Sequence, residues 1–271
     1  MKYLMAVMRA NFYAYIRELM NNKGFMFFML FWPYMMAFFM FGIGSMLGSI
    51  EEYSENMGVA NPILYILASS SIMLSSISIV DNVAGELLRH KWLGTLPYIV
   101  SSPPRLILYA IAGPIPSTLL SSFVNITVIL PAVIAIEGLI GGFKLFIVLM
   151  LIYLGMIPLI GIAVMAGGLS LIAGEDSNVA SFLTPFILLV SGVFYPQTIL
   201  PYILQLIGKC FPLVYIVEAT KILATYKYPP FTMLYSIIGF LIGLSVIYNL
   251  LTAPGVVWIE KKVLERGVYE E

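Results

Sequence analysis

Charged and metal-binding side chains are scarce in this sequence. Of its 271 residues only 10% are charged, and it contains a single cysteine and a single histidine. One cysteine cannot form a disulfide within the chain, and so few cysteines and histidines exclude the common zinc centres. The 14 basic residues balance the 14 acidic residues, so net charge gives no reason to expect nucleic acid as a partner.

Common catalytic motifs are also missing. The sequence has no glycine-rich phosphate loop ending in Gly-Lys-Ser or Gly-Lys-Thr, and no HExxH zinc motif. His90 stands between Arg89 and Lys91, a setting typical of a solvated basic patch. No grouping of nucleophile, base and metal ligands is visible, so a membrane-embedded enzyme is the weakest of three functional interpretations. We expect that the chain is not an enzyme and binds no cofactor itself.

Apolar residues, in contrast, are abundant. They make up 61% of the sequence, and the mean hydropathy is +0.98. Apolar runs of 18 or more residues are long enough to cross the roughly 30 Å hydrocarbon core of a bilayer as helices. The sequence predicts an all-α integral membrane protein, a single transmembrane domain over residues 1–271. The six expected spans are 24–47, 63–80, 106–136, 143–173, 179–193 and 233–251.

Residues 1–23 differ from the spans that follow. Lys2, Arg9 and Arg17 flank one apolar face when the segment is drawn as a helix. This pattern predicts an interfacial helix on the membrane surface, where anionic lipids attract the basic flank. The alternative is a simple helical extension of the first span.

Basic residues are unevenly distributed among the segments between the spans. If both termini are cytoplasmic, the inside segments hold four, three and three basic residues, ten in total, and only Lys144, Lys209, Lys221 and Lys227 lie outside. This excess satisfies the positive-inside rule. The sequence therefore predicts a multi-pass protein of the cell membrane with both termini cytoplasmic and a cytoplasmic loop at 81–105.

Prolines interrupt the apolar segment 191–221, at Pro196, Pro201 and Pro212. Proline lacks the backbone N–H and clashes with the preceding helical turn, so this segment cannot be one continuous helix. We predict short helical pieces that form an extracellular re-entrant hairpin between spans five and six. Glu218 is expected to be the one buried charge of this hairpin.

Ionisable residues are almost absent from the middle of the spans. Asp81 and Glu137 lie at span ends, and Asn125 is the main polar residue near the middle of one. Ion-driven transporters usually hold more ionisable groups there, and many are built from duplicated halves that this sequence lacks. The driving force is therefore expected to come from another subunit, although a stand-alone secondary transporter or channel remains the alternative.

Two segments resemble the permeases of type-2 ATP-binding-cassette (ABC) exporters. In the cytoplasmic loop, charged residues precede a Gly-Thr-Leu sequence, and serine, proline and a basic residue follow it. The matching residues are Glu86, Arg89, Lys91, Gly94, Thr95, Leu96, Ser102, Pro103 and Arg105. Pro97 departs from the family, which usually has glutamate there. In the second segment the matching residues are Ser191, Gly192, Phe194, Pro196, Pro201, Pro212, Leu213, Glu218 and Ala219.

This resemblance implies an exporter subunit that works with partners. This chain would pair in the lipid bilayer with a second permease chain, either another copy or a paralogue. Cytoplasmic ABC ATPase subunits would dock beneath the pair and bind ATP and magnesium.

The resemblance also implies roles for particular residues. A short helix near 91–98 would contact the ATPase, whereas the alternative is a plain connector held at the headgroups by Trp92 and Tyr98. The implied coupling residues are Glu86, Arg89, Lys91, Trp92, Gly94, Thr95 and Leu96, and the implied extracellular gate is Phe194, Tyr195, Pro196, Pro201, Pro212 and Glu218. Glu218 could instead cap a half-helix or pair with Lys221.

Overall fold

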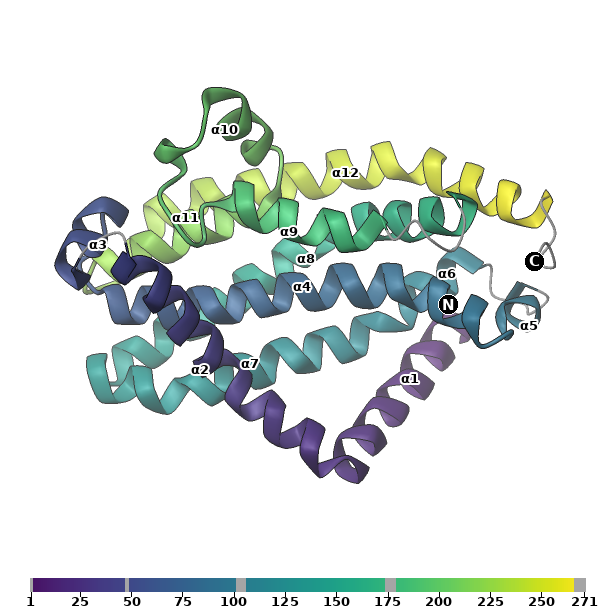
Figure 1. Cartoon of the computed structure of the whole chain (residues 1–271), viewed down its shortest axis with the longest axis horizontal. Coiled ribbons are helices and arrows are strands. Elements are labelled where there is room, and N and C mark those ends of the chain that lie inside the picture. Colours follow the sequence, from purple (N-terminus) through teal and green to yellow (C-terminus); the bar gives the residue numbers. More distant parts are fainter. Residues whose placement is uncertain (1, 47–48, 101–105, 174–178, 266–271) are drawn as a thin grey trace.

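Helices are the only regular elements in the part of the chain that the computed structural model describes, residues 2–46, 49–100, 106–173 and 179–265 (Figure 1). They are α1 (Lys2–Asn21), α2 (Lys23–Met46), α3 (Ile50–Met57), α4 (Pro62–Trp92), α5 (Leu96–Val100), α6 (Leu106–Ala112), α7 (Pro114–Glu137), α8 (Leu139–Ala173), α9 (Val179–Ser191), the 3-10 turn η1 (Gln197–Ile199), α10 (Tyr202–Lys209), α11 (Pro212–Thr225) and α12 (Phe231–Glu265).

Helix α4 forms the centre of the bundle. It packs against α2, α7, α8, α9 and α11. Its serines make this possible, because small side chains allow neighbouring helices to approach closely in lipid. Ser70 and Ser76 donate hydrogen bonds to carbonyl groups of their own helix, and Ser71 Oγ donates to the Asn125 carbonyl of α7 at 3.3 Å. Backbone carbonyl groups thus satisfy these three serine hydroxyls.

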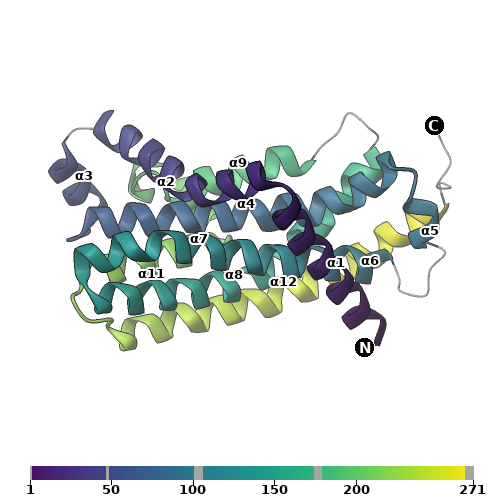
Figure 2. The ribbon, with the colours of Figure 1, turned by 90° about the horizontal axis from the view of Figure 1, so that it is seen from below.

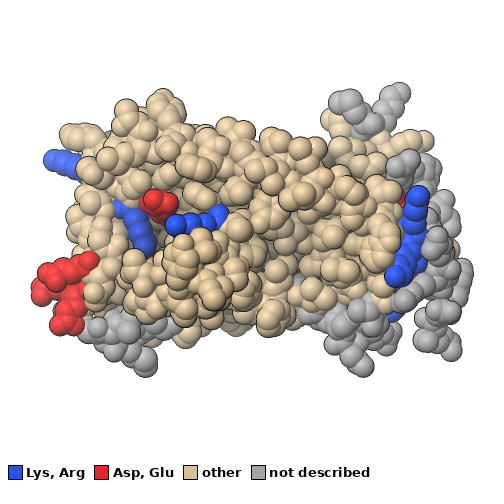
Figure 3. Space-filling view, turned by 90° about the horizontal axis from the view of Figure 1, so that it is seen from above, with Lys and Arg blue, Asp and Glu red and all other residues tan. Residues whose placement is uncertain are grey.

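Five described helices are long and apolar enough to cross a membrane, and the bent pair α10 and α11 would make a sixth. The side chains exposed along the bundle are large and apolar, among them Phe38, Phe182 and Leu250. Figure 3 shows a face whose central part is uncharged, with charged atoms at both ends and one further group set inward from one of them. The prediction of an all-helical, multi-pass membrane protein is confirmed at this level, whereas α9, at 13 residues, is shorter than a usual membrane span.

Several predicted boundaries were wrong. Helix α4 continues to Trp92 instead of ending at residue 80, because pairs of polar side chains one turn apart stabilise its extension. The predicted span 106–136 is divided into α6 and α7 at Gly113, with Pro114 at the first position of α7. The acidic loop after α2 contains helix α3, which Ser49 and Glu52 cap reciprocally.

Helices α1 and α2 form a V against one side of the bundle (Figures 1 and 2). The side chain of Asn22, at the vertex, accepts a hydrogen bond from the Phe25 amide at 3.0 Å and so caps the start of α2. Helix α1 packs against α6 and α7, while α2 packs against α4 and α7. Helix α1 is therefore not a straight extension of α2.

The two ends of the bundle differ. The start of α1, the end of α12 and helix α5 lie at one end of the long axis, and α3 lies at the other (Figures 1 and 2). The first end carries Lys261 and Lys262, and α3 carries Glu51, Glu52 and Glu55. The chain thus begins and ends on the same side of its own bundle.

Candidate functional site

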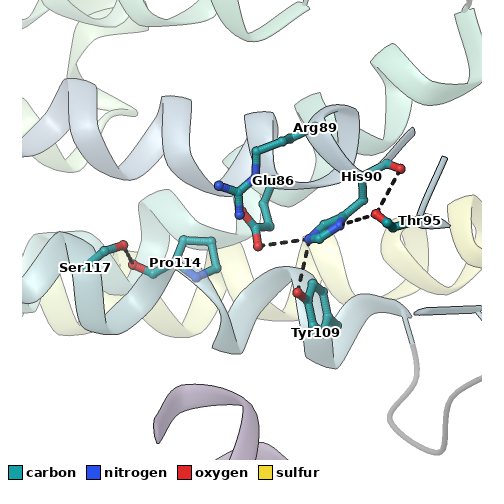
Figure 4. A network of polar contacts seen from close by, with 7 residues as sticks. All are labelled: Glu86, Arg89, His90, Thr95, Tyr109, Pro114 and Ser117. Atoms are coloured by element: carbon teal, nitrogen blue, oxygen red, sulfur yellow. Dashed lines mark hydrogen bonds and ion pairs between the residues drawn. The ribbon is translucent and has the colours of Figure 1, made fainter. Parts of the chain in front are cut away.

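The connection from α4 through α5 to α6 contains the residues implied in coupling. His90 is at its centre (Figure 4), with Nδ1 2.8 Å from Thr95 Oγ1 and Nε2 3.1 Å from the Tyr109 hydroxyl. His90 Nε2 also lies 3.2 Å from Glu86 Oε1, and Arg89 Nη2 donates to Glu86 Oε2 at 2.8 Å. One imidazole thereby joins the last turns of α4, the turn before α5, and α6.

The turn after α4 has a precise backbone geometry set by Gly94. Its φ is +65°, a left-handed conformation that glycine adopts without steric penalty. The Gly94 amide donates to the Lys91 carbonyl at 3.0 Å, and the Thr95 amide donates to the His90 carbonyl at 3.0 Å. This pair of bonds is the Schellman motif that ends many helices. The Gly-Thr dipeptide therefore terminates α4 and directs the chain into α5.

Apolar side chains project from this connection into the surroundings. Trp92, Leu93 and Tyr98 are 67%, 65% and 78% exposed. Lys91 is half-buried and Arg89 is exposed. Exposed aromatic and aliphatic groups next to basic ones, presented on a fixed turn, are typical of a docking surface. Leu96 begins α5.

The resemblance in this loop continues beyond α5. Ser102, Pro103 and Arg105, which complete the resemblance in this loop, lie outside the described residues. Pro97, where the family usually has glutamate, is half-buried in α5. The site is therefore described by the residues from Glu86 to Tyr98 together with α6.

The residues implied in the outer gate lie on a different part of the bundle. Each proline precedes or opens a helical piece: Pro196 before η1, Pro201 before α10 and Pro212 at the start of α11. Helices α10 and α11 meet at 93°. Three short pieces thus follow α9, as expected where proline removes a backbone donor.

Side chains near the start of this segment hold it to the bundle. The Phe194 ring packs edge-on against Phe39 of α2, with centroids 6.5 Å apart. The Tyr195 hydroxyl donates to the Leu189 carbonyl at 2.7 Å. Tyr65, fully buried on α4, places its hydroxyl 3.4 Å from the Gly192 carbonyl and 3.3 Å from the Val193 carbonyl. Helix α4 therefore contacts the root of the hairpin.

The predicted burial of Glu218 was wrong. It is exposed on α11, while its neighbours Val217 and Ala219 are buried. It does not cap a helix, since α11 begins six residues earlier at Pro212, and no ion pair joins it to Lys221 among the described residues. The helical period explains the error: the bundle-facing side of α11 is apolar, and Glu218 points away from it.

Sequence analysis missed a buried ion pair near α3. Lys144 of α8 is only 1% exposed, and its Nζ lies 2.7 Å from Glu137 Oε2 at the end of α7. The Asn61 side chain, at the start of α4, donates to Glu137 Oε1 at 2.7 Å. The Asn61 backbone amide donates to the Ala224 carbonyl of α11 at 3.0 Å. These bonds join four helices, α4, α7, α8 and α11. The sequence signal for this site was Lys144, a lysine at the start of a long apolar run.

The sequence matches no model of a known protein family and no curated protein. Functional interpretation therefore depends on the geometry of the two sites and on the resemblance of their sequences.

His90→Ala should loosen the connection without unfolding the bundle. The variant removes contacts to Thr95, Glu86 and Tyr109, each worth about 1 kcal/mol. We expect the amides of Gly94 and Thr95 to exchange with deuterium about tenfold faster or more, with little change in the melting temperature. Lys91→Ala is the control, because the Lys91 side chain makes no hydrogen bond or ion pair within the described part of the chain. Equal exchange in both variants would contradict the role assigned to His90.

Proposed function

We propose that this chain is the transmembrane subunit of an ATP-driven exporter of the type-2 ABC class. It would form the translocation path with a second copy or a paralogue and be driven by separate cytoplasmic ATPase subunits. The observation that carries this proposal is that side chains of α4 make polar contacts with both implied sites. At one end His90 holds the turn before α5, and near the other Tyr65 contacts the root of the α9–α11 hairpin.

The length of α4 supports a mechanical link. Its 31 residues extend about 46 Å at 1.5 Å per residue, longer than the roughly 30 Å hydrocarbon core. One end can therefore project from the membrane while the helix remains packed on α7 and α8. Thr184 of α9 donates to Asp81 Oδ1 at 2.9 Å midway along this path, so α9 can follow a movement of α4.

Docking of an ATPase would use the exposed apolar residues of the connection. Trp92, Leu93 and Tyr98 would enter a groove on the ATPase, and the neighbouring Arg89 and Lys91 would steer the encounter. ATP and magnesium would bind to the ATPase subunit. Closure of the ATPase pair would push the turn at Gly94, and α4 would transmit the displacement to the hairpin.

The proposed orientation places α5 and both chain ends in the cytoplasm and the hairpin outside the cell. It is supported by the basic residues Lys261 and Lys262 near the end of α12, because Lys and Arg are enriched in cytoplasmic segments. The exposed apolar belt would contact membrane lipids of the cell membrane.

Labelling of Cys210 tests this orientation. Cys210 is exposed at the end of α10, so a membrane-impermeant maleimide should label it in intact cells. In a Cys210→Ser background, Trp92→Cys should react only after the membrane is permeabilised. Labelling of position 92 in intact cells would reverse the orientation and remove the basis for cytoplasmic docking.

Reconstitution tests the function itself. The chain should co-purify with an ABC ATPase, and flux in proteoliposomes should require both that ATPase and ATP. Candidate substrates are screened by their stimulation of ATP hydrolysis. Flux by the chain alone, driven by an ion gradient or by none, would instead support the stand-alone transporter or channel.

A further inference from the structure

A two-part cavity lies in the angle between α1 and α2, against α4 and α7. The first part has a volume of about 400 Å³ and the adjoining part about 330 Å³. Tyr15, Phe25 and Asn82 line both parts, so the two parts adjoin. The combined volume is in the range of sites that hold small organic molecules.

The first part of the cavity is polar and has an excess of negative charge. Three acidic residues and one basic residue line it: Glu18, Asp81, Glu86 and Arg89. Arg89 pairs with Glu86, whereas Glu18 and Asp81 have no basic partner among the described residues. Asp81 accepts one hydrogen bond, from Thr184. Two carboxylates are thus available to a ligand.

Aromatic side chains border this polar part. Burial first, and then the neighbouring Glu18 carboxylate, raise the pKa of the Tyr15 phenol above its ordinary value, so Tyr15 stays neutral. Phe25 lies where the two parts meet, and Trp32 lines the second. Aromatic faces attract ammonium groups, most strongly those of tryptophan.

The second part of the cavity is mainly apolar, with one polar side chain deep within it. Its walls include Phe28, Met29 and Trp32 of α2 and Leu74 and Ile77 of α4. Asn125 of α7 also lines it and is only 5% exposed. Its backbone carbonyl accepts from Ser71, but its side-chain amide makes no hydrogen bond within the described part of the chain. Because Asn125 lines the cavity, its amide is free to hydrogen-bond a polar group of a ligand there.

We propose that this cavity binds an amphipathic cation: an ammonium head between Glu18 and Asp81, an apolar body along α2 and α4, and a polar group within reach of Asn125. Both a membrane lipid with an amine or choline head and a soluble cationic amphiphile have this chemistry. The proposal concerns binding by the chain itself and does not depend on an ATPase.

Quenching of Trp32 fluorescence tests the proposal on the purified full chain in a non-ionic detergent. Trp92→Phe and Trp258→Phe leave Trp32 as the sole tryptophan. The probe is a brominated dodecyltrimethylammonium, compared with a brominated dodecyl sulfate of the same tail. We expect saturable quenching by the cation, with apparent affinity about tenfold or more above that of the anion, because hydrogen bonds and ion pairs to charged groups favour one sign.

Variants then assign the binding to the two carboxylates. Glu18→Gln with Asp81→Asn should weaken binding of the cationic probe about tenfold, and the amide at 81 can still accept from Thr184. Glu51→Gln with Glu55→Gln removes two carboxylates from α3, at the other end of the bundle, and should change nothing. If the double variant does not fold, Glu18→Gln alone replaces it as the test. Glu18 is exposed, and its side chain makes no ion pair within the described residues, so this single substitution should not unfold the chain.

The outcomes separate the possibilities. Competition by phosphatidylcholine would identify a lipid head as the occupant, and competition by short-chain cationic amphiphiles alone would identify a soluble ligand; both support the site. Equal quenching by the cation and the anion, or quenching unchanged by Glu18→Gln, would show partitioning into the detergent shell and overturn the proposal. Neither result bears on coupling to an ATPase, so the two proposals fail independently.

Discussion

Gly94→Pro is expected to abolish ATP-dependent export while the chain remains folded and inserted in the membrane. Proline is restricted to φ near −65°, and Gly94 has φ +65°. The substitution also removes the amide that donates to the Lys91 carbonyl. The turn must therefore reorganise, and the exposed docking residues that follow it must change direction. We expect export and substrate-stimulated ATP hydrolysis to fall about tenfold or more.

Gly58 provides a matched control for this substitution. It has φ +67°, its amide donates to the Glu55 carbonyl at 3.1 Å, and no atom lies within 4 Å of a Cβ built on either glycine. Gly58 terminates α3 at the opposite end of the bundle. Gly58→Pro should thus strain the backbone comparably without affecting ATPase coupling. Export that falls equally in both variants would remove the special role given to the turn at Gly94.

Lys144→Met should destabilise the protein strongly. Removal of the ammonium group leaves the Glu137 carboxylate without its partner in a largely buried position, and breaking one side of a buried ion pair costs about 3–5 kcal/mol. The measurement is thermal unfolding of the purified chain in a fixed detergent. We expect a clearly lower melting temperature, with less chain recovered after membrane extraction.

A double variant separates lost charge pairing from lost packing. Glu137→Gln combined with Lys144→Met removes both charges, and the amide oxygen can still accept from Asn61. The double variant should recover most of the stability, because replacing both partners of a buried pair is often close to neutral. Lys227→Met, at an exposed position, should be neutral. A double variant as unstable as Lys144→Met would mean that packing of the lysine stem, rather than its charge, stabilises this site.

Sequence alone predicted the class of protein and most of the long helices. Apolar runs are a direct measure of membrane-length helices, so α2 and α8 were found near their observed positions. Helix α4 was underestimated because hydropathy ends a span at the first charges, whereas Glu86, Arg89 and His90 pair along one helix face and extend it. Gly94 was recognised in a motif, but its left-handed turn follows from the backbone geometry.

The candidate sites were less predictable where they depend on packing between distant segments. Prolines predicted the breaks around α10 correctly, since their effect is local. The Lys144 and Glu137 pair was missed because Lys144, at the start of the predicted span 143–173, was counted only as a basic residue on the outside. Tyr65 and Gly192 are 127 residues apart in sequence, and nothing local to either predicts their contact. The link between the coupling connection and the hairpin emerged only from the fold.

Crosslinking from position 92 tests the central claim most directly. The Trp92 side chain is 67% exposed at the end of α4, so a photoreactive phenylalanine analogue placed there should capture whatever docks on the connection. We expect a crosslink in cells to the nucleotide-binding subunit of an ABC transporter, stronger with ATP turnover blocked, and none from the same analogue at Glu51 on α3. The proposed function would be contradicted if the analogue at position 92 captured no ATPase. It would also be contradicted if reagents outside the cell reached that position.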